Sequence, residues 1–219
     1  MTAAYLYALA SAGEDEAMWL ADAGLTRGYE GVLQAYEEAF AGVAKAKPGE
    51  ELAHALDRGL RLIDYRAGRE RQAIESVDRL APDGRREQTH AAADELAGRL
   101  TEFAEGQQSR LRAAAERRSG APVTPKPAAD PRLTEARTMV IRRKRPGTVT
   151  FDDLPVPERK GYPSGAWWGP QVSALFWCDG KRNLAEVIEL TEMELGPTDF
   201  DFVGYFRFLA EKGYVDLVN

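Results

Sequence analysis

The segment SGAPVTPKPAADP, from Ser119 to Pro131, holds four prolines and one glycine. Proline lacks a backbone N–H donor and disfavours helical geometry in the residue before it, so neither a helix nor a central strand can run through this segment. We therefore predict a linker at residues 119–136, with one domain at residues 1–118 and a second at residues 137–219. A chain of 219 residues is long enough for one large or two small domains.

The residues before the linker are typical of three long helices. Turn sequences at Lys47-Pro48-Gly49 and Ala81-Pro82-Asp83-Gly84 separate them, because proline and glycine favour turn geometry. Short connections make consecutive helices antiparallel, so we predict an elongated antiparallel helical hairpin bundle. Apolar residues recur within each helix at helical spacing: Val32, Leu33, Tyr36, Phe40 and Val43; Leu52, Leu56, Leu60, Ile63, Ala67, Ile74 and Val77; and Ala93, Leu96, Leu100, Phe103, Leu111 and Ala114.

The apolar stripes of this bundle are narrow. Glu70 and Gln107 occupy positions where the repeat would place an apolar side chain. A bundle with such stripes buries little apolar surface by itself, and burial of apolar surface is the main stabilising contribution to folding. We therefore expect it to pack against a second copy or another domain.

The residues after the linker predict a small winged-helix-like α+β module. A short strand at residues 138–145 ends at Pro146-Gly147, and three short helices follow at residues 170–178, 184–195 and 199–212. Residues 214–218 form a closing strand. The expected fold class of the whole chain is therefore mainly α.

The net charge of -6 is unevenly distributed along the chain. Residues 1–118 carry 16 Lys and Arg against 21 Asp and Glu, residues 119–160 carry 9 against 5, and residues 161–219 carry 4 against 9. Only the middle segment has the excess of cations that a nucleic-acid surface requires. Its cations are candidate phosphate contacts, or the charges of an exposed edge strand: Arg142, Arg143, Lys144 and Arg145.

The third short helix disfavours DNA as a partner. A winged helix that reads DNA places cationic and amide side chains of this helix in the major groove. Here Asp199, Asp201 and Glu211 accompany only Arg207 and Lys212. A protein-contacting role is favoured, with these candidates for an exposed aromatic patch, although the same aromatics could instead fill a small core: Trp167, Trp168, Phe200, Tyr205 and Phe208.

The residue inventory narrows the available chemistry. Cys178 is the only cysteine, so no internal disulfide can form, and His54 and His90 are the only histidines. Neither histidine belongs to an HExxH pair, and we expect no catalytic residue, no metal and no cofactor. The mean hydropathy of -0.43 is typical of a soluble globular protein, and no apolar run approaches the ~20 residues of a membrane span.

The first residues have one feature of a secretion signal. Met1 to Gly13 contains an apolar stretch that ends in Ala10-Ser11-Ala12, but no Lys or Arg precedes it. A signal peptide normally begins with a basic region, so a buried helix is the favoured interpretation and we expect a cytoplasmic protein.

Several C-terminal segments resemble a known family. LFWCDGKRNL at Leu175–Leu184, EMELG at Glu192–Gly196 and YFRFL at Tyr205–Leu209 look like the winged-helix tail of some bacterial zinc-dependent aminopeptidases of the aminopeptidase S type. The opening, Thr2–Leu20, is similar to the last helix of such a catalytic domain. The resemblance implies that this chain corresponds to the part of such a peptidase that follows the active site.

The resemblance also implies that the chain is not an enzyme. The two-zinc site of that family uses His, Asp and Glu ligands that precede the region resembled here, and neither His54 nor His90 lies in a matching motif. The expected function is a non-catalytic interaction and assembly portion of an aminopeptidase-like protein. Its winged helix would contact protein, and its partner would be a peptidase domain or a second copy in a homodimer.

Two other functions stay open at this point. The first is a dimeric winged-helix transcriptional regulator that uses the basic strand for DNA phosphate contacts. The second is an enzyme whose ionisable side chains are brought together only by folding.

Overall fold

The computed structural model describes residues 13–163 and 168–218. The protein is mainly helical, as predicted, and divides into two compact units, Met1–Ala128 and Ala129–Asn219. In the described residues, no helix combines the length and the apolar character that a bilayer span requires. The opening segment discussed above as a signal peptide or buried helix lies almost wholly outside the described residues.

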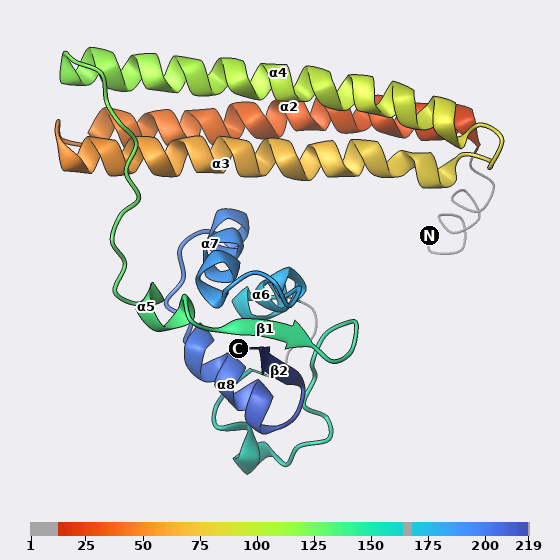
Figure 1. Cartoon of the computed structure of the whole chain (residues 1–219), viewed down its shortest axis with the longest axis vertical. Coiled ribbons are helices and arrows are strands. Elements are labelled where there is room, and N and C mark those ends of the chain that lie inside the picture. Colours follow the sequence, from red (N-terminus) through yellow and green to blue (C-terminus); the bar gives the residue numbers. More distant parts are fainter. Residues whose placement is uncertain (1–12, 164–167, 219) are drawn as a thin grey trace. The chain divides into compact units, whose positions relative to one another are not determined.

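Three long helices build the first unit. They are α2 (Glu14–Lys45), α3 (Glu50–Glu75) and α4 (Arg86–Ser119), and a short 3-10 helix, η1 (Ser76–Leu80), extends α3. Figure 1 shows the three helices side by side with alternating directions, so the unit is an antiparallel hairpin bundle. The turns fall where proline and glycine predicted them, at residues 46–49 and 81–85.

Small side chains form much of the seam between these helices. The buried positions of α2 follow steps of three and four residues, the spacing of a helix that packs along one face. A helix with Ala and Gly on this face can approach its neighbours closely, because little side chain separates the backbones. These positions are Ala17, Ala21, Leu25, Gly28, Val32, Ala35, Ala39 and Val43.

The alanine seam corrects one prediction for α2. Leu33 and Phe40 were expected in the apolar core stripe, but their side chains are 41% and 43% exposed. Successive residues of a helix lie about 100° apart, so a core that follows Val32 and Ala39 turns Leu33 and Phe40 outward. Alanine contributes little to a hydrophobic pattern, so the larger side chains of Leu33 and Phe40 led to a wrong prediction of the buried face of α2.

The two polar interruptions of the stripes are accommodated by hydrogen bonds. The Arg27 guanidinium donates to Glu70 from Nε and Nη2, at 2.9 and 2.6 Å, and links α2 to α3. Gln107 is buried and accepts a hydrogen bond from Arg110 at 2.8 Å. Because a buried polar group is costly only when it lacks a partner, both residues are compatible with the bundle.

The second unit combines short helices with a two-stranded sheet. Strand β1 (Val140–Arg143) pairs antiparallel with β2 (Val215–Val218), with Val140 opposite Val218 and Arg143 opposite Val215. The other elements are α5 (Leu133–Ala136), η2 (Val156–Arg159), α6 (Pro170–Trp177), α7 (Leu184–Leu195) and α8 (Phe202–Glu211).

Helix α5 lies within the segment that we predicted as linker. Leu133 and Ala136 are buried in the core of the second unit, so packed structure begins before residue 137. The four prolines end at Pro131, and nothing in the backbone of the residues after it opposes a helix turn.

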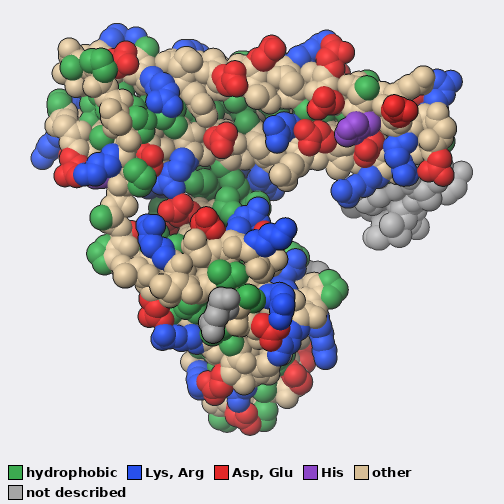
Figure 2. Space-filling view, in the orientation of Figure 1, with side chains coloured by type: hydrophobic (Ala, Val, Ile, Leu, Met, Phe, Trp, Pro, Cys, Tyr) green, Lys and Arg blue, Asp and Glu red, His purple; other side chains and the backbone are tan. Residues whose placement is uncertain are grey.

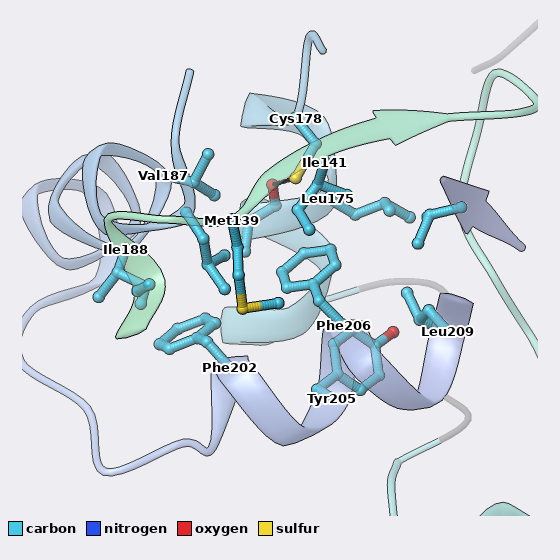
Figure 3. Close-up of a cluster of buried hydrophobic side chains, with 14 of the residues drawn as sticks. Met139, Ile141, Leu175, Cys178, Val187, Ile188, Phe202, Tyr205, Phe206 and Leu209 are labelled. Carbon is cyan, nitrogen blue, oxygen red and sulfur yellow. Dashed lines mark hydrogen bonds between the residues drawn. The ribbon is translucent and has the colours of Figure 1, made fainter. Parts of the chain in front are cut away.

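The core of the second unit is formed by side chains from its helices and from β1. Figure 3 shows them converging from β1, α6, α7 and α8. Phe206 and Leu209 of α8 and Ile141 of β1 are fully buried at its centre. This core holds the turn between α8 and β2 next to the end of β1, where the cavity described below is found.

Candidate functional site

A cavity of about 520 Å³ lies at the C-terminal end of β1 in the second unit. Its wall consists of residues 143–153, Leu175 of α6, and the turn formed by residues 212–214 between α8 and β2. The chain leaves β1 through Pro146 and Gly147, and Gly147 has a φ of 95°, which favours glycine. The volume is within the ~300–1,000 Å³ range of small-molecule sites.

The four candidate phosphate contacts are not equivalent in the structure. Arg142 does not line the cavity: its guanidinium donates to the cross-strand residue Asp216 at 3.0 Å. The ammonium of Lys144 lies 3.3 Å from the other carboxylate oxygen of Asp216. Hydrogen bonds from Arg142 and Lys144 hold the pKa of Asp216 below its ordinary value. These two cations are therefore engaged across the β1–β2 pair.

Arg143 and Arg145 have different surroundings. Arg143 is anchored, because its Nε donates to the carbonyl of Cys178 at 3.2 Å and its guanidinium lies 5.8 Å from the centre of the Phe176 ring. Arg145 is exposed and makes no ion pair with any residue that the structure describes. Figure 2 shows Lys and Arg side chains gathered near the end of β1 on the visible face of the unit. Arg143, Lys144 and Arg145 all line the cavity.

Two carboxylates line another part of the cavity wall, and each has a hydroxyl partner. Thr150 donates to Asp152 at 2.6 Å, and the Tyr214 hydroxyl donates to Asp153. Burial and this hydrogen bond raise the pKa of Tyr214 to about 12, so its hydroxyl stays protonated at neutral pH. Sequence analysis missed these residues, because loop carboxylates and hydroxyls follow no periodic pattern.

Phe151 holds an unusual backbone conformation in the cavity wall. Its φ is 56°, in the left-handed region that non-glycine residues occupy at a cost of roughly 1–3 kcal/mol, and its side chain is buried. The ring packs edge-on against Phe208, with 5.4 Å between ring centres, and lies 5.6 Å from that of Tyr214. Aromatic packing therefore fixes the loop that forms one side of the cavity.

The predicted aromatic patch is only partly exposed. Trp167 lies outside the described residues, whereas Trp168 is 85% exposed. Phe200 is half-buried, with its ring 5.3 Å from that of Tyr205. Tyr205 and Phe208 are buried in the core, which corrects their assignment to an exposed patch. Both lie on the inner face of α8 together with Phe202, Phe206 and Leu209, and the helix begins at Phe202, capped by Asp201, rather than at residue 199.

A second surface of interest lies on the outer side of α2. Trp19 is 69% exposed and follows the same helical line as Leu33 and Phe40, from which it is 14 and 21 residues away. We call Trp19, Leu33 and Phe40 the α2 stripe. Sequence analysis assigned Leu33 and Phe40 to the core and did not single out Trp19. The signal that could have found it is the seven-residue spacing, which is typical of a coiled-coil seam.

Aromatic contacts with α4 border the α2 stripe. The rings of Tyr29 and Phe103 meet edge-on at 4.8 Å. The guanidinium of Arg110 lies over the ring of Tyr36 at 4.7 Å, and Tyr36 in turn lies 6.0 Å from Phe40. These contacts fix the side chains on the α4 side of the α2 stripe and place the Arg110 guanidinium beside it.

The histidines and the cysteine have structural contacts. His54 Nδ1 lies 2.7 Å from the carbonyl oxygen of Lys126, and His90 Nδ1 lies 3.3 Å from Asp78. Cys178 is buried, its thiol donates to the carbonyl of Ala174 at 3.2 Å, and burial raises its pKa to about 12. Among residues 13–163 and 168–218, no three His, Cys, Asp or Glu side chains are grouped so that they could hold a metal ion.

Comparisons of the chain with protein-family models, with curated proteins and with solved structures each find no match.

Proposed function

We propose that this chain is a non-catalytic interaction and assembly protein, and that its helical bundle pairs with a second copy through the α2 stripe. The observation that carries the proposal is the exposure of Trp19, Leu33 and Phe40 at 69%, 41% and 43% along one helical line. Large apolar side chains that are exposed in a row mark an interaction surface more often than single exposed residues do.

The geometry of the α2 stripe suits a helix partner. Seven residues make nearly two turns of an α-helix, so Trp19, Leu33 and Phe40 lie along a line of about 32 Å. Thr26 occupies the remaining heptad position, and its hydroxyl is satisfied by the carbonyl of Asp22 at 3.2 Å. The line is thus free of charged residues from Trp19 to Phe40, as the centre of a helix–helix interface requires.

Charge complementarity favours a second copy as the partner. Arg110 borders the α2 stripe on the α4 side, whereas helical geometry places Glu30 and Glu37 on its opposite side, four residues after Thr26 and Leu33. Neither glutamate makes an ion pair with a described residue. A two-fold axis parallel to α2 brings the acidic border of each copy against the basic border of the other, and closes the assembly as a dimer.

We propose a protein-contacting role for the second unit too. The order of α6, α7, α8 and β2, with β1 paired to β2, supports a winged-helix-like arrangement. The cations of α8 and of its C-cap are already paired, Arg207 with Glu135 and Lys212 with Glu158 at 2.8 Å, which disfavours DNA contact by this helix. Among the described aromatic residues of this unit, Trp168 is the most exposed, at 85%, and so the most available to a protein partner.

A peptidase domain is the other partner in this proposal. It rests on the resemblance of the C-terminal segments to the tail of aminopeptidase S-type enzymes, and the chain would then act as the part of such an enzyme that does not perform catalysis. The α2 stripe itself is assigned to the second copy, because the charges on its two borders are complementary to each other.

Light scattering of the full chain over a range of concentrations tests the assembly. We expect a dimer, and we expect Leu33→Glu to dissociate it into monomers because the substitution places a carboxylate in the seam. Gln34→Glu is the matched control: it adds the same charge one residue away, about 100° around the helix, and leaves the dimer intact. Circular dichroism confirms that both variants keep the helical content of the parent.

The border charges test the orientation. Arg110 lies over the Tyr36 ring, at the same level along α2 as Glu37, so in the dimer it faces Glu37 of the other copy. Glu37→Arg therefore weakens the dimer, and the double variant with Arg110→Glu restores it. A parent chain that stays monomeric at every concentration, or a Leu33→Glu variant that associates like the parent, overturns the proposal. If the chain stays monomeric and binds only a peptidase domain, the α2 stripe is the docking surface for that domain and not for a second copy.

A further inference from the structure

The cavity at the end of β1 has a cationic side that is partly fixed in place. Arg143, Lys144, Arg145 and Lys212 line it. Anchoring of Arg143 Nε on the Cys178 carbonyl leaves the two terminal nitrogens of the guanidinium for a ligand. Arginine presents these donors in a planar fork that matches phosphate oxygens.

The loop that follows β1 offers further donors. Pro146 has no N–H, and none of the hydrogen bonds among the described residues uses the backbone amide of another residue from 144 to 151 as its donor. Thr148, Val149 and Thr150 are nonetheless half-buried. An amide N–H without an acceptor in the protein bonds to water or to a bound ligand, so these amides are available as donors. Successive free amides in an irregular loop are a common element of anion sites.

The loop is held in place before any ligand arrives. The strained backbone of Phe151 is maintained by its ring contacts with Phe208 and Tyr214. Strain of this kind is concentrated at binding sites, where the surrounding packing fixes an otherwise unfavourable conformation. A preformed loop binds more tightly, because less conformational entropy is lost on binding.

The carboxylates of the cavity limit where an anion can lie. Asp152 and Asp153 accept hydrogen bonds from Thr150 and Tyr214, and neither forms an ion pair with a cation of the cavity lining among the described residues. Lys144 and Lys212 are each shared with a carboxylate outside the cavity lining, Asp216 and Glu158. The anion therefore belongs beside Arg143 and Arg145.

From these features we propose that the cavity binds the phosphate group of a small phosphate monoester, with the two arginines and the loop amides as donors. A phosphate accepts at three oxygens and carries close to two negative charges, which suits two guanidiniums and several amides better than a carboxylate does. At roughly 30 Å³ per water molecule, 520 Å³ corresponds to about 17 waters, enough for a phosphate and an attached organic group of modest size.

Nuclear magnetic resonance titration of the full chain tests the proposal, with inorganic phosphate and adenosine monophosphate as probes and succinate as the carboxylate control. We expect saturable shifts of the amides of residues 144, 145 and 147–150 with both phosphates and at least tenfold weaker binding of succinate. Arg145→Gln is expected to weaken phosphate binding at least tenfold. Lys181→Gln removes an exposed cation of the same unit that does not line the cavity, and leaves binding unchanged.

Arg145→Gln is the decisive variant. The Arg145 side chain makes no ion pair with a described residue, so loss of its charge does not disturb folding. Arg143→Gln is the second variant, and its spectrum shows whether the loss of the Cys178 contact alters the fold. The proposal is overturned by the absence of a saturable shift with either phosphate, by equal responses to phosphate and succinate, or by undiminished binding by Arg145→Gln. Tighter binding of a DNA duplex than of the monoester, with strong salt dependence, would overturn it in favour of a nucleic-acid surface.

Discussion

Gly59 of α3 lies directly against Ala39 of α2. A Cβ atom built on Gly59 would be 2.7 Å from the Ala39 Cβ and 2.8 Å from Leu111 Cδ2 of α4, closer than carbon atoms approach without a shift of one of them. The three helices of the bundle therefore meet at a point where only a hydrogen atom fits.

We expect Gly59→Ala to destabilise the bundle. Overpacking of a core costs about 1–3 kcal/mol, whereas the higher helix propensity of alanine contributes about 1 kcal/mol in the opposite direction. The net loss is up to about 2 kcal/mol, because the Ala39 side chain has no rotamer with which to move aside. Urea denaturation followed by far-ultraviolet circular dichroism measures it.

Gly68→Ala is the matched control for this effect. Gly68 lies on the same helix, and a Cβ atom there has no neighbour within 4 Å. The higher helix propensity of alanine then acts without any overpacking, so the free energy of unfolding of this variant rises by about 0.5–1 kcal/mol. Opposite signs for the two variants support close packing at Gly59, and a stabilised Gly59→Ala chain would contradict it.

The first turn of α7 is expected to depend on Asn183. The Asn183 side chain accepts from the Glu186 amide at 3.1 Å, and Glu186 accepts from the Asn183 amide at 2.9 Å, which completes a capping box. Asn183→Ala removes half of this pair and costs about 1 kcal/mol. Hydrogen exchange of the α7 amides reports the loss as faster exchange in the first turn, while Lys181→Ala leaves it unchanged.

The number and order of the bundle helices could be predicted from the sequence, because proline and glycine end helices for local reasons. The turns after Lys45 and before Arg86 depend only on residues next to them. The buried face of α2 could not be predicted in the same way. It is set by Ala35 and Ala39, whose small side chains let α3 and α4 approach, and closeness of that kind depends on residues far away in the sequence.

The candidate site shows a similar division. The cluster of cations after Ile141 is visible in the sequence, but the pairing of Arg142 with Asp216 depends on the register of β1 and β2, which joins residues 74 positions apart. The burial of Tyr205 and Phe208 depends on Phe151 and Tyr162, whose rings pack against them from a loop more than 40 residues earlier in the chain. Contacts between residues far apart in the sequence thus decided which predicted residues reach the surface.

Asp216 is expected to make the stability of the second unit dependent on pH. Its pKa is lower in the folded protein than in the unfolded chain, because Arg142 and Lys144 stabilise the carboxylate. The stabilisation is complete above the unfolded value of about 3.9 and is lost as the pH falls through the lower folded value. Asp216→Asn therefore weakens the unit at neutral pH, and its difference from the parent shrinks below about pH 4.

Asp199→Asn provides the control for this charge effect. Asp199 is exposed, and no ion pair joins it to a residue that the structure describes. We expect denaturation midpoints of this variant to follow those of the parent across the whole pH range. A constant difference between Asp216→Asn and the parent from neutral pH down to the acid range would show that the cross-strand pair does not act through charge.

Cys178 is expected to report the opening of the second unit. Its thiol is 1% exposed, it donates to the carbonyl of Ala174, and burial raises its pKa to about 12. A thiol reagent needs both access and the thiolate, so labelling of the folded chain requires transient opening. We expect labelling at least a thousandfold slower than in denaturant, and the signal is unambiguous because the chain has no other cysteine.

Leu184→Ala tests the connection between this labelling and the core. Leu184 is fully buried in the same cluster as Cys178, and its truncation costs about 2–5 kcal/mol. If opening limits the reaction, the labelling rate rises in proportion to the change in the opening equilibrium, by at least tenfold. Lys181→Ala, at an exposed position of the turn after Cys178, leaves the rate unchanged, and rapid labelling of the folded parent chain would show that the thiol is accessible without opening of the core.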